Sequence, residues 1–316
     1  ALLAEAAELP LRIRRNLLCA RFAAKRMSLT GDRIGNQLIQ LYTVYNENPQ
    51  YWTSTPIPAM LEGVDGVISY MEDLEKTAKL PCFIASYQTQ FSNVPVTFSD
   101  ITKNSIDAKI RVEELLDSEY KNYEVIYTDA FLDPLTGLCG IGVFNHTRKQ
   151  KIFGKCKKHT HICAAEITAI KVAFNSIRED PLGTVILSDS KSALQCIQKK
   201  GLNQQNNSST LKIKELYLDM RARGKTIKLV WIPSHSGIPG NEIADQLANR
   251  GRTEATHYVK NKIHFTEVLK VLKDETWNEW KLLYSRMGQQ KGQAYYRIVK
   301  KPYKSPWFKI TKKSRK

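Results

Sequence analysis

The chain has 316 residues, 42% of them hydrophobic, which is enough for about two globular domains with buried cores. Its 48 lysines and arginines exceed its 31 aspartates and glutamates, giving a formal net charge of +17. This excess favours a polyanionic partner, nucleic acid before an anionic membrane surface. No apolar run approaches the roughly 20 residues of a membrane-spanning helix, so we expect no membrane partner.

The cysteines point to a reducing compartment. The six of them form neither a CxxC pair nor a zinc-ligand spacing. Because disulfide frameworks belong to short secreted chains, we expect reduced, buried cysteines in an intracellular protein of the cytoplasm, the nucleus or both. The chain starts with Ala1 and resembles neither a signal peptide nor a transit peptide there, so we expect a fragment of a longer protein.

The first 120 residues predict a helical connector without a chemical motif. Residues 1–45 have a helical pattern that is broken at Pro10. Their arginines and lysines favour a solvated helix face, and contact with nucleic acid is the alternative. Residues 46–120 combine Pro-rich turns with polar stretches, which we interpret as a linker with some helix.

From Tyr123 the pattern predicts a sheet. In EVIYTDAF, Val125, Tyr127 and Asp129 share one face of a strand. The segments LCGIGVFNHT and KIFGKCKK follow as strands, so the three together predict an antiparallel meander. CAAEITAIKVAFNSIRE is a helix, TVILSDS an apolar strand, and two more helices lead to the strand TIKLVWIP. This order predicts an α/β fold with a mixed sheet covered by helices.

The stretch SHSGIPGNEIADQLA then combines a loop with a helix. Prolines and glycines surround His235, so this histidine is expected in a loop. A helical pattern begins at Asn241, and Asp245 projects beside its apolar face. An acid so close to the start of a helix is often there only because its charge interacts favourably with the helix dipole. Asp245 alone therefore does not indicate a functional site.

Four acids occupy positions at which a purely structural role would be unfavourable. Asp129 lies within a strand, which disfavours aspartate, and Glu166 lies on the apolar stripe of its helix. Asp189 ends an apolar strand, where open α/β sheets bind ligands, although a helix N-cap is the simpler role for it alone. Asp245 is the fourth acid.

Few basic residues could neutralise these acids; Lys171 and Lys191 are the nearest in sequence. Oxygen ligands without histidine or cysteine suit Mg²⁺ or Mn²⁺ better than zinc. Several carboxylates together favour a two-metal site, which activates water and stabilises the leaving oxygen of a phosphodiester.

Residues 123–251 resemble a type 1 ribonuclease H domain of the kind carried by LINE-type (non-LTR) retrotransposon polyproteins. YTDAF is similar to the family's first-strand aspartate motif, AAEITAI to its helix glutamate and LSDSKSAL to its fourth-strand aspartate. WIPSHSGIPGNEIADQLA is similar to its histidine loop and last aspartate. One departure is Ala130-Phe131, where the family has a glycine and a small residue; Phe131 could crowd the minor groove of a hybrid.

The resemblance implies a ribonuclease H-like mixed sheet of five strands flanked by helices, with helical, basic N- and C-terminal flanks. It implies that two Mg²⁺ ions, for which Mn²⁺ can substitute, are bound without a small-molecule cofactor. The implied metal ligands, which are also the implied catalytic acids, are Asp129, Glu166, Asp189 and Asp245. His235 is implied as a mobile catalytic group that assists proton transfer or product release.

The function that the resemblance implies is endonucleolytic hydrolysis of the RNA strand of an RNA–DNA hybrid, leaving a 5′-phosphate and a 3′-hydroxyl. Recognition is expected through 2′-hydroxyls, groove shape and phosphates. Two other hypotheses stay open: an inactive nucleic-acid-binding module of the same fold, and a DNA-cutting relative such as an integrase.

The flanks resemble the family more loosely. AEAAELPLRIRRNLLCARF resembles the connector after a reverse transcriptase thumb, and residues 277–307 resemble the region that follows the ribonuclease H domain. The expected domains are thus a connector at 1–120, the ribonuclease H domain at 121–252 and a basic helical extension at 253–316. A YADD-type aspartate pair is missing from the sequence, so we expect the C-terminal part of such a polyprotein, or a degraded or domesticated copy.

Overall fold

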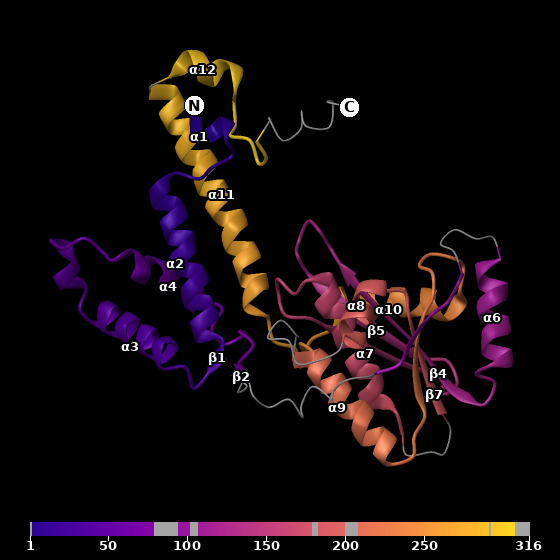
Figure 1. The fold of residues 1–316 in the computed structure, drawn as a ribbon. Coiled ribbons are helices and arrows are strands. Elements are labelled where there is room, and N and C mark those ends of the chain that lie inside the picture. Colours follow the sequence, from indigo (N-terminus) through magenta and orange to yellow (C-terminus); the bar gives the residue numbers. More distant parts are fainter. Residues whose placement is uncertain are drawn as a thin grey trace. The chain divides into compact units, whose positions relative to one another are not determined.

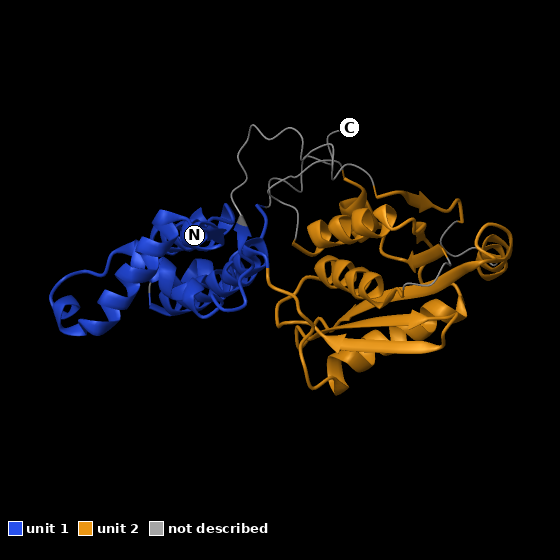
Figure 2. Cartoon of the chain, turned by 90° about the horizontal axis from the view of Figure 1, so that it is seen from below, with its two compact units in different colours: residues 1–78, 264–316 blue, residues 79–263 orange. Residues whose placement is uncertain are grey.

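The computed structural model describes residues 2–78, 94–101, 107–178, 183–199, 208–290 and 292–306. The chain divides into two compact units, one of residues 1–78 with 264–316 and one of residues 79–263 (Figure 2). The boundaries expected at residues 120 and 252 stay a prediction. Several parts of the expected linker, polar loop and basic tail fall outside the described residues: 79–93, 102–106, 200–207 and 307–316.

The first unit is helical, as expected for the flanks. Aromatic side chains of its longest helix, Trp280 and Tyr284, pack with Ala4 and Ile13, and Trp277 lies against the same cluster. The two tryptophans therefore belong to a core. None of the helices in the described stretches is long and apolar enough to cross a bilayer. The elements are α1 (Leu2–Glu5), α2 (Leu11–Met27), α3 (Arg33–Glu47), η1 (Pro49–Thr53), α4 (Ala59–Ile68), α11 (Phe265–Gln290), α12 (Gln293–Ile298) and the parallel pair β1 (Leu29–Thr30) and β2 (Thr77–Ala78).

The second unit is built on a six-stranded mixed sheet with the order β3-β8-β7-β4-β5-β6. The antiparallel meander predicted from the sequence is confirmed as β4, β5 and β6. On the other side of β4, the strands β7, β8 and β3 run parallel to it. The strands are β3 (Val96–Phe98), β4 (Tyr123–Leu132), β5 (Cys139–Asn145), β6 (Gln150–Lys155), β7 (Gly183–Ser188) and β8 (Ile227–Trp231).

The sixth strand corrects the expected count of five. The sequence pattern predicts a linker at residues 96–98, yet Val96–Phe98 pair with Leu229–Trp231 along the edge of β8. A strand of three residues is too short to show an alternating pattern, and its hydrogen bonds depend on a partner more than 130 positions away along the chain. Only the folded sheet therefore reveals it.

Helices cover both faces of this sheet (Figure 1). Alternate residues of β4 point to opposite faces, so Ile126 joins the core with α7 and α9 while Val125 and Tyr127 join the core with α10. α10 begins at Pro239, two residues before the expected start, because proline is well suited to the first helical position. The helices are α6 (Ala108–Ser118), α7 (Ile162–Ser176), α8 (Lys191–Gln198), α9 (Ser208–Ala222) and α10 (Pro239–Glu254).

Candidate active site

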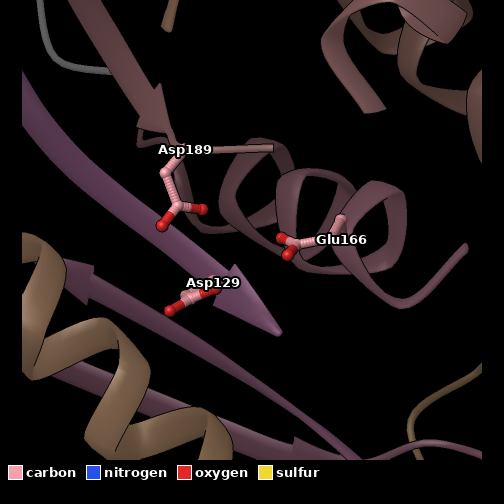
Figure 3. Close-up of side chains that lie close together, drawn as sticks. All are labelled: Asp129, Glu166 and Asp189. Atoms are coloured by element: carbon pink, nitrogen blue, oxygen red, sulfur yellow. The ribbon is translucent and has the colours of Figure 1, made fainter. Parts of the chain in front are cut away.

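Three of the predicted acids lie together at the point where the parallel pairing of the two central strands, β4 and β7, ends. Asp129, Glu166 and Asp189 each offer a carboxylate oxygen, and these oxygens all lie within 4.8 Å of one another (Figure 3). They come from β4, from α7 and from the residue directly after β7. Residues 23 to 60 positions apart in sequence thus form a single carboxylate cluster.

The ends of two parallel strands place the aspartates. β4 pairs with β7 as far as Thr128 and Ser188; Asp129 is the next residue of β4, and Asp189 directly follows the end of β7. β7 stops there, whereas β4 continues against β5 to Leu132. The carboxyl ends of parallel strands are where open α/β sheets bind ligands. Asp189 does not cap the following helix, because the N-cap of α8 is Ser190, whose hydroxyl accepts a hydrogen bond from the Ala193 amide at 3.4 Å.

Glu166 is buried in the second turn of α7. The residue is 6% exposed, and within the described part of the chain its Oε2 has no hydrogen-bond partner. His161 caps this helix, since its Nδ1 accepts a hydrogen bond from the Cys163 amide at 3.3 Å. A buried carboxylate oxygen without a partner is costly, so a cation would be a stabilising ligand here.

Glycines on β5 bring α10 close to this cluster. Gly142 is the direct cross-strand partner of Asp129. A Cβ atom at Gly142 would lie 2.6 Å from the Ala248 backbone nitrogen and closer still to the Ala244 carbonyl oxygen. The missing side chain therefore lets the backbone of α10 rest on β5, and the half-buried Asp245 follows Ala244 on that helix. Asp245 lies outside the cluster of three but near enough to act on the charge of Asp129.

The site has an excess of negative charge. Burial first, and then the charges of Asp189 and Asp245, raise the pKa of Asp129 to about 8. Burial and the neighbouring charges of Asp129 and Asp189 likewise hold the pKa of Glu166 well above its usual range. None of the ion pairs among the described residues involves these four acids.

Burial also raises the pKa of Asp189, against the opposing effects of an amide and a histidine. The amide is that of Asn241, whose Nδ2 donates a hydrogen bond to Asp189 Oδ2 at 3.1 Å. The histidine is His235, which is exposed in a turn after β8 and has a φ of 51°. His235 lies outside the cluster of three, and its influence on Asp189 places it near the site.

Asn241 is the site residue that the sequence did not single out. It is 5% exposed and begins the turn of α10 that leads to Asp245 four residues later. Residues at this spacing lie on the same face of a helix, so a polar pair at 241 and 245 was an available signal. The lysines nearest in sequence have other contacts: the Lys171 ammonium donates to Ser209, and the Lys191 ammonium lies over the rings of Phe98 and Trp231.

A family model described as RNase H matches residues 121–253. The ribonuclease H of Alcanivorax borkumensis is 30% identical over 144 residues, which cover 42% of this chain and 93% of that protein. The chain belongs to the ribonuclease H family. The ribonuclease H of Dichelobacter nodosus is also similar, with 32% identity over 136 residues, 40% of this chain and 89% of that protein.

Ribonucleases H generally use divalent metal ions, and the residues of this chain fit such a ligand. The clustered donors are all carboxylate oxygens, which suit hard cations such as Mg²⁺. Within the described residues, Glu166 Oε2 has no hydrogen-bond partner, and burial together with the neighbouring acids raises the pKa of Asp129 and of Glu166, so a bound cation would relieve this repulsion.

Phe131, the departure from the ribonuclease H pattern, packs toward α10. The Arg252 guanidinium lies 5.2 Å from the centre of the Phe131 ring and donates to Asp133 at 2.9 Å. Gly140, which faces Phe131 across the strands, leaves room for this arrangement. The aromatic ring is therefore held by a side chain of α10, two residues from Asp129.

Proposed function

We propose that this ribonuclease H-family chain hydrolyses the RNA strand of RNA–DNA hybrids endonucleolytically, leaving a 5′-phosphate and a 3′-hydroxyl. The observation that carries the proposal is the cluster of Asp129, Glu166 and Asp189 oxygens within 4.8 Å of one another. A largely buried group of carboxylates at the ends of parallel strands fits a phosphodiester hydrolase better than a purely structural site. The net charge of +17 supports a nucleic-acid partner.

Asp129, Glu166, Asp189 and Asp245 would hold two Mg²⁺ ions, for which Mn²⁺ can substitute. When bound, these ions lower the pKa of a water molecule and neutralise charge on the leaving oxygen. Asn241 would keep the Asp189 carboxylate oriented through its hydrogen bond. Asp129 and Glu166 would release protons as the cations bind, because burial and mutual repulsion favour their protonated forms in the metal-free site.

His235 would assist proton transfer or product release. Its exposed position in a turn allows the imidazole to exchange protons with solvent while it lies near Asp189. A left-handed backbone conformation is uncommon for residues other than glycine, and histidine is among those that tolerate it better. The turn can therefore present the imidazole without glycine at this position.

We place the chain in the C-terminal part of a LINE-type retrotransposon polyprotein or a copy derived from one, acting in the cytoplasm, the nucleus or both. In this proposal residues 1–120 are the connector, 121–252 the ribonuclease H domain and 253–316 the basic extension. The helical unit formed by both ends of the chain supports helical flanks around the catalytic domain.

The test compares a labelled RNA–DNA hybrid with single-stranded RNA, duplex RNA and duplex DNA, each with and without Mg²⁺. Cleavage of the hybrid alone, dependent on Mg²⁺, is the expected result. Binding of the hybrid without cleavage would instead identify an inactive nucleic-acid-binding module. Cleavage of duplex DNA would identify an integrase-like activity.

A further inference from the structure

A short segment that follows α10 is bound to the outer edge of β6. Tyr258 forms a parallel bridge with Lys155, and the Val259 amide donates a hydrogen bond to the Lys155 carbonyl at 2.7 Å. Gly154 leaves room for this contact, since a Cβ atom there would overlap Val259 Cγ1. The segment, residues 258–261, belongs to the compact unit that holds the carboxylate cluster, although the RNase H match ends before it.

Val259 also contacts the core beside the carboxylates. It packs against a small hydrophobic cluster between β5 and α7 that includes Ala130 and Ala165. These two alanines are the sequence neighbours of Asp129 and Glu166. The segment after α10 is therefore part of the packing that supports two of the three clustered acids.

Asn261 bonds to both ends of the turn that joins β6 to α7. Its Oδ1 accepts a hydrogen bond from the Lys157 amide at 3.2 Å, and its Nδ2 donates one to Thr160 Oγ1 at 3.0 Å. The Thr160 hydroxyl in turn donates to the Lys157 carbonyl at 2.6 Å. Asn261 is 7% exposed and Thr160 is 2% exposed, so these bonds are shielded from water. Together they form a closed ring of hydrogen bonds that fixes the turn.

This turn determines where α7 begins. His159 lies within it at a φ of 69°, a left-handed conformation that costs a residue other than glycine free energy and needs support from its surroundings. Thr160 is followed directly by His161, the N-cap of α7. Glu166 stands in the second turn of the same helix, so a change in the turn would displace its carboxylate.

We propose that Asn261 is a positioning residue of the active site, which fixes the turn before α7 and thereby holds Glu166 in place for a divalent cation. This proposal rests on the proposed metal-dependent function. Asn261 lies outside the cluster of three acids and acts through the helix. Removal of groups that orient a metal ligand typically lowers metal affinity about 10- to 100-fold, so a loss at this remove is expected near the lower end.

The experiment uses the full chain, with Mg²⁺ alone as the probe in isothermal titration calorimetry, at a temperature at which each protein is folded. Asn261→Ala removes both side-chain hydrogen bonds to the turn. We expect its Mg²⁺ affinity to fall about tenfold. In hybrid cleavage, kcat should fall at limiting Mg²⁺ and recover at saturating Mg²⁺, while KM for the hybrid stays unchanged.

Asn145→Ala is the matched control. Asn145 is 2% exposed and makes the same two kinds of bond: its Oδ1 accepts from the Arg148 amide, and its Nδ2 donates to Glu124. It ends β5, three residues past the cross-strand partner of Asp129. We expect this variant to lose stability but to bind Mg²⁺ like the parent. An equal loss of Mg²⁺ affinity in both variants, or none in Asn261→Ala, would overturn the positioning role.

A second pair of variants tests the other side of the bond and decides the matter if Asn261→Ala does not fold. Thr160→Val keeps the shape of the side chain but removes the hydroxyl that accepts from Asn261, whereas Thr160→Ser keeps the hydroxyl. We expect the valine variant to bind Mg²⁺ more weakly and the serine variant to bind it like the parent. Parent-like affinity in both would refute the proposal.

Failure of the proposed hydrolase function has a different signature. If the parent binds Mg²⁺ but cleaves no hybrid, the hydrolase function is wrong, while the Mg²⁺ affinities of the variants still decide the role of Asn261. If the parent binds no Mg²⁺, the positioning of Glu166 for a cation is wrong as well.

Discussion

The side chain of Asn241 donates a hydrogen bond from Nδ2 to Asp189 Oδ2 at 3.1 Å. This bond joins the start of α10 to the end of β7 and orients one of the three clustered carboxylates. A second contact, between α10 and Gly142 of β5, fixes how closely the same helix packs on the sheet beside Asp129, because Gly142 is the cross-strand partner of Asp129. The site therefore depends on how α10 seats against the sheet as well as on the acids themselves.

Replacing Asp189 by asparagine should remove catalysis and keep substrate binding. The amide retains the shape of the side chain, but it lacks the negative charge needed to hold a divalent cation. We expect kcat for hybrid cleavage to fall about 10³-fold or more, equivalent to about 4 kcal/mol in the barrier. Hybrid affinity, measured by fluorescence anisotropy, should stay within about threefold of the parent, because phosphate contacts dominate binding.

Asp219→Asn is the matched control for that substitution. Asp219 is an exposed residue of α9 that pairs with Arg223, and exposed ion pairs contribute little to stability. This variant should cleave like the parent. A parent-like rate in Asp189→Asn would show that Asp189 has no part in catalysis.

Asp129→Asn should stabilise the metal-free protein, and more so at higher pH. The folded parent keeps the Asp129 proton between about pH 4 and pH 8, whereas the unfolded chain has released it. The unfolding free energy of the parent therefore falls as pH rises through this window, and the variant avoids this loss. In EDTA at pH 8 we expect the variant to gain about 1–2 kcal/mol, or roughly 2–8 °C in Tm.

In millimolar Mg²⁺ we expect the opposite order of stability, with the parent more stable than Asp129→Asn. The cation stabilises the ionised carboxylates, so the Tm of the parent should rise more than that of Asp129→Asn, and more at pH 8 than at pH 6. Equal melting curves for the two proteins across this pH range would contradict a clustered, ionisable site.

His235→Asn should slow turnover without weakening Mg²⁺ binding. Asparagine tolerates the left-handed backbone of this turn, so the variant removes the imidazole and leaves the loop intact. We expect kcat to fall about 10- to 100-fold, with Mg²⁺ affinity by calorimetry unchanged. His257→Asn, at another exposed histidine, serves as the control. A large loss of Mg²⁺ affinity in His235→Asn would place this histidine among the metal ligands.

Gly142→Ala should damage both stability and activity. The added methyl group would overlap the backbone of α10 at Ala244 and Ala248, so the helix that carries Asp245 must move away from β5. We expect the free energy of unfolding, measured by urea denaturation, to fall by about 1–3 kcal/mol, and kcat to fall as well. Gly66→Ala is the control: Gly66 lies inside α4, where alanine stabilises a helix by about 1 kcal/mol over glycine, and the added methyl group would lie 3.5 Å from the Leu272 side chain of α11, an ordinary contact distance. Equal unfolding of Gly142→Ala and the parent would show that α10 does not depend on this close approach.

The sequence by itself determined the elements whose signals are local. In EVIYTDAF, alternate residues share one face of a strand, and this pattern predicted β4. The three successive strand patterns predicted the antiparallel meander. The position of Glu166 on an apolar stripe predicted a buried carboxylate, which is 6% exposed in the structure. Hydrophobic periodicity carries this information because each element must present one face to a core, whatever its distant neighbours are.

Only the tertiary structure decided which distant residues meet. β3 forms because Val96–Phe98 pair with the outer edge of β8, and so short a strand shows no periodic pattern in the sequence. The bond from Asn241 to Asp189 and the placement of Phe131 beneath Arg252 each join separate elements. Such contacts depend on the register of the strands and the seating of the helices, which follow from packing of the whole core and have no local signature.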